Sequence, residues 1–110
     1  MVKILRFKKK YGEKIKSGEK KTTIRLSTKL KPGDTVKIFA GEESLGKARI
    51  ISIKRKRMSE LTERDAERDG FNSVDELRRA LKKHYRNISE RSFVSIIEFN
   101  LMRRESKKKK

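Results

Sequence analysis

Phe93-Val94-Ser95-Ile96-Ile97-Glu98-Phe99-Asn100-Leu101 is the stretch of sequence that decides the fold. Its side chains alternate between two faces when the chain is extended, and both faces are apolar. One face carries Phe93, Ile97, Phe99 and Leu101, and the other carries Val94 and Ile96. A strand that is apolar on both faces is usually central in a sheet or lies in the wall of a barrel. The stretch therefore predicts a sheet that is covered on both sides.

The segments before this strand alternate between strand and helix patterns. Two short predicted helices interrupt a series of β-branched strands, and a third lies near the start of the chain. The predicted order is a strand over 2–7, a helix over 11–17, strands over 22–26, 35–39 and 45–55, a helix over 59–70, a helix from 73 onward, and the last strand over 93–101.

Several residues mark the ends of these elements. Gly18 is expected to end the first helix, and Gly46 to mark a bulge in the long strand. Ser59 is the expected N-cap of the second helix, which should end at Gly70. Ser73-Val74-Asp75-Glu76 has the pattern of a capping box, and the helix after it is amphipathic. Its expected inward residues are Val74, Leu77, Ala80 and Leu81.

Together these elements predict an α+β fold, a small mixed β-barrel with a short N-terminal helix and two inserted helices. A chain of 110 residues has room for one domain, which we expect over 1–101. The lysine-rich segment 102–110 should be a disordered basic tail.

The net charge of +18 is unevenly distributed along the chain. Residues 1–31 hold twelve Lys or Arg and two Glu, whereas residues 59–76 hold seven acids and two arginines. Such polarity suits a partner with many negative charges, and nucleic acid is the most common one. A solvated surface is the alternative, since the scarcity of Asn, Gln and Cys beside abundant Lys, Arg and Glu is also typical of a thermophile protein.

The composition also argues against several kinds of site. With no cysteine and a single histidine, His84, a metal centre is not expected, and no cofactor motif is present. We find no apolar run long enough to span a membrane and no secretory signal, so the chain is expected in the cytoplasm.

The residues 17–25, Ser-Gly-Glu-Lys-Lys-Thr-Thr-Ile-Arg, gather cations and hydroxyls at the entry to a strand. Thr23 and Arg25 are two residues apart and should project to the same side, with Lys20 in the loop before them. An arginine and a lysine beside a hydroxyl form a compact site for an anion or a carbonyl. Taken from the spacing alone, ordinary surface residues at a strand entry are the favoured interpretation.

Two other cationic runs are candidates for contacts with phosphate. A solvated strand end is the alternative for the second run. The residues are Lys8, Lys9 and Lys10 in the first run, and Lys54, Arg55, Lys56 and Arg57 in the second.

The spacing Gly18-x-Lys20-x-x-Thr23-x-Arg25 resembles the signature of ASCH domains, which have a PUA-like barrel fold. Further landmarks resemble that family in the same order along the chain. They are Pro32-Gly33-Asp34, Leu61-Thr62-Glu63, Ala66, Asp69-Gly70-Phe71 and 93–99. The resemblance implies a cleft between the signature segment and the helical insert.

The resemblance also implies two functions. ASCH domains are proposed to bind RNA, which predicts an RNA- or nucleotide-binding cleft around Gly18–Arg25, with Lys20, Lys21 and Arg25 at the ligand. A related bacterial branch hydrolyses the amide of N4-acetylcytidine without a metal. Its lysine and threonine correspond to Lys20 and Thr23, and its glutamate corresponds to Asp69. A third interpretation, an adaptor for an acidic protein, has no peptide-groove motif to support it.

Overall fold

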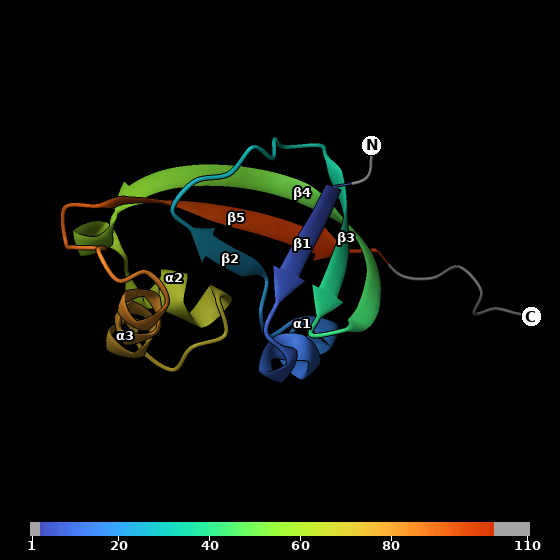
Figure 1. The fold of residues 1–110 in the computed structure, drawn as a ribbon, viewed down its shortest axis with the longest axis horizontal. Coiled ribbons are helices and arrows are strands. Elements are labelled where there is room, and N and C mark those ends of the chain that lie inside the picture. Colours follow the sequence, from blue (N-terminus) through green and yellow to red (C-terminus); the bar gives the residue numbers. More distant parts are fainter. Residues whose placement is uncertain (1–2, 103–110) are drawn as a thin grey trace, which may run out of the picture.

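The computed structural model describes residues 3–102, and the predicted basic tail lies almost entirely outside them. Residues 3–102 form five strands, three α-helices and two 3₁₀ turns (Figure 1). The strands are β1 (Lys3–Phe7), β2 (Thr22–Arg25), β3 (Thr35–Ala40), β4 (Glu43–Arg57) and β5 (Phe93–Leu101). The helices are α1 (Gly12–Ser17), α2 (Glu63–Arg68) and α3 (Val74–His84), and the turns are Lys9–Tyr11 and Met58–Glu60.

The five strands form one curled mixed sheet in the order β1-β3-β4-β5-β2. The β1–β3 pair is parallel and the other pairs are antiparallel. The two edge strands, β1 and β2, curl toward each other, as Figure 1 shows, so the sheet is a half-barrel. The predicted α+β class, the short first helix and the two inserted helices are confirmed.

Two apolar cores lie on the two faces of the sheet, and β5 contributes to both. Ile97 and Phe99 pack inside the half-barrel, whereas Val94 and Ile96 pack under α2 and α3. The barrel core consists of Leu5, Phe7, Ile15, Val36, Ile38, Ala48, Ile50, Ile97 and Phe99. The second core consists of Ile24, Met58, Leu61, Ala66, Leu77, Leu81, Val94 and Ile96. The prediction of a strand buried on both sides is thus confirmed.

The predicted N-cap at Ser59 is wrong. Ser59 lies in a 3₁₀ turn, and its backbone N–H donates to the carbonyl of Glu90 at 3.1 Å. The side chains of Met58, in this turn, and of Leu61, directly after it, are buried. The α-helix therefore begins only at Glu63. Thr62 is the N-cap, and its hydroxyl accepts a hydrogen bond from the N–H of Asp65.

The ring of Phe93 is 45% exposed, although β5 is buried on both faces further along. Phe93 shares a face with Ile97, but it lies beyond the end of the barrel core at the start of β5. The predicted bulge is confirmed, since the β3–β4 register shifts next to Gly46. No helix within residues 3–102 is long and apolar enough to cross a membrane.

Candidate functional site

Lys20 is turned into the protein by the end of α1. Gly18 takes a left-handed φ of 86° and ends the helix, a conformation that glycine adopts without strain. The backbone N–H of Lys20 then donates to the carbonyl of Lys14 at 2.9 Å. As a result Lys20 is only 4% exposed, whereas every other lysine within residues 3–102 is at least partly exposed.

Asp69, at the C-terminal end of α2, is the partner of Lys20. Lys20 Nζ donates to Asp69 Oδ2 at 3.0 Å and to the Asp69 carbonyl at 2.9 Å. The other carboxylate oxygen, Oδ1, accepts from the hydroxyl of Thr22 at 2.7 Å. Asp69 is also 4% exposed, so the two residues form a buried ion pair between the start of β2 and the end of α2.

Three aromatic rings surround the Lys20 ammonium. Its Nζ lies 4.9 Å from the ring centre of Tyr11, 5.7 Å from that of Phe71 and 5.8 Å from that of Phe7. Ring faces attract a cation, and they also exclude water from it. An ammonium has three N–H donors, and two are used by Asp69. The third has no acceptor among the described residues, which leaves one donor for a ligand.

Burial acts in opposite directions on the two members of this pair. It lowers the pKa of Lys20 below its ordinary 10.5, against the attraction of Asp69. It raises the pKa of Asp69, against the attraction of Lys20 and the hydrogen bond from Thr22. Each shift favours the neutral form, so a proton leaves Lys20 more readily here than at the surface.

Thr23 and Arg25 lie side by side, as their spacing predicts. Arg25 Nε donates to Thr23 Oγ1 at 3.0 Å, which leaves the threonine O–H free to donate to another group. Arg25 Nη2 donates to the carbonyl of Arg6 in β1 at 2.8 Å, so this one side chain links the two edge strands. The burial of the guanidinium lowers the pKa of Arg25, but an arginine stays charged.

Lys20, Thr23, Arg25 and Asp69 line one pocket of about 160 Å³, which opens between the edge strands β1 and β2 and helix α3. Lys8 lines it as well, so the structure brings the three predicted catalytic residues together with two further predicted binding cations, Arg25 and Lys8. Cations at its edge include Arg6 and Lys8. Its aromatic lining consists of Phe7, Tyr11, Phe71, His84 and Tyr85.

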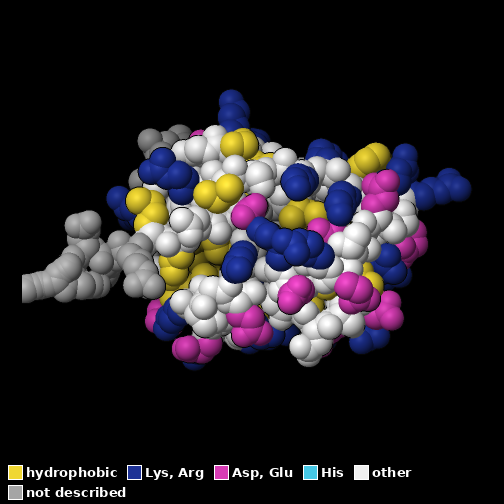
Figure 2. Space-filling model, turned by 180° about the vertical axis from the view of Figure 1, so that it is seen from behind, with side chains coloured by type: hydrophobic (Ala, Val, Ile, Leu, Met, Phe, Trp, Pro, Cys, Tyr) yellow, Lys and Arg dark blue, Asp and Glu magenta, His cyan; other side chains and the backbone are white. Residues whose placement is uncertain are grey.

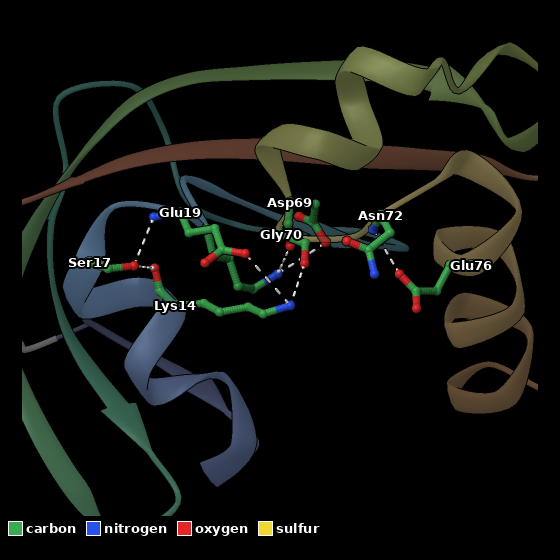
Figure 3. A network of polar contacts seen from close by, with 8 residues as sticks. Lys14, Ser17, Glu19, Asp69, Gly70, Asn72 and Glu76 are labelled. Atoms are coloured by element: carbon green, nitrogen blue, oxygen red, sulfur yellow. Dashed lines mark hydrogen bonds and ion pairs between the residues drawn. The ribbon is translucent and has the colours of Figure 1, made fainter.

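Hydrogen bonds hold the loop after α2 against α1 and α3 (Figure 3). Lys14 Nζ donates to the carbonyl of Gly70 at 2.7 Å, and the N–H of Asn72 donates to Glu76 at 2.7 Å. Gly70 has a φ of 86°, and a Cβ there would lie 3.3 Å from the Cβ of Lys20. Glycine is therefore required beside the buried lysine, both for its backbone and for space.

The two cationic runs are divided between faces. In β4, Lys54 and Lys56 lie on the α2 side, where Lys56 pairs with Asp65 at 2.7 Å. Arg55 and Arg57 lie on the opposite face, next to Phe93. Alternation along a strand separates the members of such a run, so the four cations do not form one patch.

The remaining predicted cations also lie apart. Lys8 lies at the pocket, whereas Lys9 and Lys10 are exposed in the 3₁₀ turn. Lys21 points away from the pocket into a different hollow, which it shares with Lys16 and Glu98. In the view from behind, lysine and arginine side chains lie among carboxylates rather than in a uniform positive patch (Figure 2).

Thr22 is the residue of this site that the sequence did not single out. The pairing of Thr23 with Arg25 drew attention to one face of β2, and Thr22 projects from the other face. Asp69 reaches Thr22 because α2 packs on that second face. Thr22 could have been identified only by predicting which face of the sheet α2 covers.

Comparisons with known proteins agree with this fold. A family model described as ASCH domain matches residues 3–103. Protein EF3133 from Enterococcus faecalis V583 has a TM-score of 0.75 at 18% identity, over 93% of this chain and 80% of its own. An ASCH domain from Lactobacillus crispatus JV V101 has a TM-score of 0.70 at 16% identity, over 80% and 67%. Hypothetical protein PH0355 has a TM-score of 0.73 at 26% identity, over 93% and 100%. No curated protein matches the chain.

Proposed function

The chain belongs to the ASCH domain family, and from this membership we propose that it binds RNA or a nucleotide in the pocket beside Lys20. The observation that carries the proposal is the lining of the pocket, which combines cations with aromatic rings. Proteins that recognise single-stranded RNA stack unpaired bases on aromatic side chains and neutralise the phosphates with lysine and arginine.

Each part of a nucleotide has a counterpart in the pocket. A base lies against the rings of Tyr11, Phe71 or Tyr85, within reach of the free N–H of Lys20 and the hydroxyl of Thr23. The phosphate lies toward Lys8 and Arg6, at the more exposed edge of the pocket. Lys20 thus contacts the base rather than a phosphate, because Asp69 already neutralises its charge.

Salt dependence is the first test of this function. The affinity for a single-stranded RNA should fall as salt is raised, with a slope of about −0.7 in log K against log salt for each phosphate neutralised. Fluorescence anisotropy with a labelled oligonucleotide measures this slope. An affinity that is unchanged between low and moderate salt would contradict the proposal.

A pair of lysine variants makes the salt test specific to the pocket. Lys8→Ala removes a cation that lines it, so the slope should become shallower by about 0.7. Lys37→Ala removes an exposed cation from β3, away from the pocket, and should leave the slope unchanged. Equal effects of the two variants would point to non-specific attraction by the net charge.

Hydrolysis of the amide of N4-acetylcytidine, or of a related nucleobase amide, is a second candidate. The observation that favours it is the burial of Lys20 beside Asp69, which lowers the pKa of the lysine. A lysine with a lowered pKa is neutral at a lower pH than a surface lysine and can then accept a proton as a general base. No other lysine in the described residues is buried in this way.

The reaction uses groups that are already in place. Neutral Lys20 takes a proton from water, and the hydroxide adds to the acetyl carbonyl while the O–H of Thr23 donates to the oxyanion. Lys20 then returns the proton to the amide nitrogen as the C–N bond breaks, which releases cytidine and acetic acid, and the acid loses its proton to water. Asp69 holds the ammonium that forms in between. N4-acetylcytidine that stays intact after long incubation with the protein at high temperature would exclude this substrate.

A further inference from the structure

Phe93 is an exposed aromatic ring set between two arginines on the open face of the sheet. The centre of its ring lies 4.6 Å from the guanidinium carbon of Arg57 and 5.6 Å from that of Arg55. It is 45% exposed, although the other apolar residues of β5 on this face are largely covered. Neither the fold nor the Lys20 pocket accounts for this exposure.

The arginines beside Phe93 carry uncompensated charge. Arg55 donates to Ser95 Oγ at 2.9 Å and more weakly to the carbonyl of Leu26, and Arg57 donates to the carbonyl of Arg91. Neither forms an ion pair with a carboxylate among residues 3–102. On the opposite face of the same strands, Lys56 is paired with Asp65 and Arg68 with Glu98. A polyanion is therefore favoured on the Phe93 face.

This surface is continuous with the Lys20 pocket through the register of the sheet. Arg25, which lines the pocket, is directly opposite Ser95 in β5, and Ser95 is opposite Arg55 in β4. Phe93 and Arg57 form the next pair on the same face. Two residues along a strand and one strand across correspond to about 8 Å between the backbone positions of Arg25 and Phe93, so one oligonucleotide can contact both.

A second hollow lies between the two places, at the C-terminal end of α3 and the loop that follows it. It is lined by Leu26, Ile88 and Ser92, and it shares His84 and Tyr85 with the Lys20 pocket. Ser92 directly precedes Phe93, so the hollow ends next to the exposed ring. A single-stranded RNA bound in the Lys20 pocket can therefore extend through this hollow toward Phe93.

We propose that Phe93, with Arg55 and Arg57, forms a stacking platform for a second base of a single-stranded RNA whose first base occupies the Lys20 pocket. This inference rests on the proposed RNA binding and adds to it the ligand's class and direction. The exposed part of Phe93 stacks the base together with the guanidinium groups that lie over its ring, and these arginines also contact the phosphates. Lys54 and Lys56 are not part of this surface.

The test compares two phenylalanines that each lie under an arginine. Phe93→Ala should weaken the binding of a single-stranded RNA of about ten nucleotides by about 5- to 150-fold, the usual cost of losing one stacked base. Phe39→Ala, where Arg6 lies 5.2 Å from the ring centre on a different strand, should change binding little. Heparin, a polyanion without bases, should bind wild type and Phe93→Ala equally.

Phe93→Trp gives an independent readout, because the chain contains no other tryptophan. RNA should quench the fluorescence of Phe93→Trp on stacking and leave Phe39→Trp unchanged. If wild type binds RNA but Phe93→Ala binds it equally well and Phe93→Trp is not quenched, the platform is wrong and RNA binding stands. If wild type binds no RNA, the proposed function fails, and this inference fails with it.

Discussion

Replacing Asp69 with asparagine is expected to lower the free energy of unfolding by about 3–5 kcal/mol, because it leaves the Lys20 ammonium buried without a counter-charge. Both side chains are almost fully buried, so solvent does not screen the loss. Urea unfolding of wild type and Asp69→Asn measures the difference. In an exposed pair the same change costs little, so Glu90→Gln, next to Lys82 at the surface, is the matched control, with an expected cost below about 1 kcal/mol.

A double variant separates charge from shape in this result. Lys20→Met together with Asp69→Asn removes both charges and should recover most of the lost stability, since the three rings around Lys20 suit an apolar chain. If the double variant is no more stable than Asp69→Asn, the loss does not come from an unpaired charge.

The cost of Asp69→Asn should also depend on pH. Burial already lowers the pKa of Lys20, and without the attraction of Asp69 this pKa falls further. The unfolded chain then binds the proton more tightly than the folded protein, so the stability of the variant rises with pH and is lost as pH falls through the folded pKa. The gap to wild type should therefore narrow at alkaline pH.

Replacing Lys20 with arginine should reduce any nucleobase amidohydrolase turnover by about 10²- to 10⁴-fold, the usual contribution of a general base. Arginine keeps a positive charge beside Asp69 but does not release a proton, so pairing is retained and basicity is lost. Turnover by wild type should rise with pH and level off below the ordinary lysine pKa of 10.5, because burial lowers the pKa of Lys20. Release of acetate from N4-acetylcytidine, followed over a pH series, measures both effects.

Lys21→Arg is the control for the Lys20 variant. Lys21 is the next residue, but it is exposed and faces a different hollow. Its replacement should leave turnover unchanged, whereas a pure RNA-binding protein should show no turnover to lose. A Lys20→Arg variant that is folded and as active as wild type would exclude Lys20 as the base.

Local sequence patterns predicted the elements whose form depends on neighbouring residues. Gly18 ends α1, the alternation in 93–101 produces a strand buried on both faces, and Ser73 caps α3. The expected capping box is only half formed, because Glu76 accepts from Asn72 rather than from Ser73. The N–H groups of Asn72 and Ser73 are both close to Glu76 along the chain, and the sequence pattern does not indicate which of them the carboxylate accepts from.

The features that local sequence patterns did not predict depend on contacts between segments that are distant along the chain. Ser59 pairs its backbone with Glu90, and no local signal reports that partner. Phe93 follows the apolar alternation of its strand but lies where the barrel core has ended. The Lys20–Asp69 pair was anticipated only through the family resemblance, since the two residues are 49 positions apart. Thr22 depended on the side of the sheet that α2 covers.

The link from Arg25 to the carbonyl of Arg6 has a consequence for how the half-barrel moves. The edge strands β1 and β2 are joined there by a side chain instead of a ladder of backbone hydrogen bonds. Separating them breaks that contact without unpairing any strand, so local opening at this seam requires little free energy. Native-state hydrogen exchange should accordingly find the least protected strand amides along these two edges. Arg25 also lines the pocket, so a ligand that binds Arg25 should change how readily the two edge strands separate.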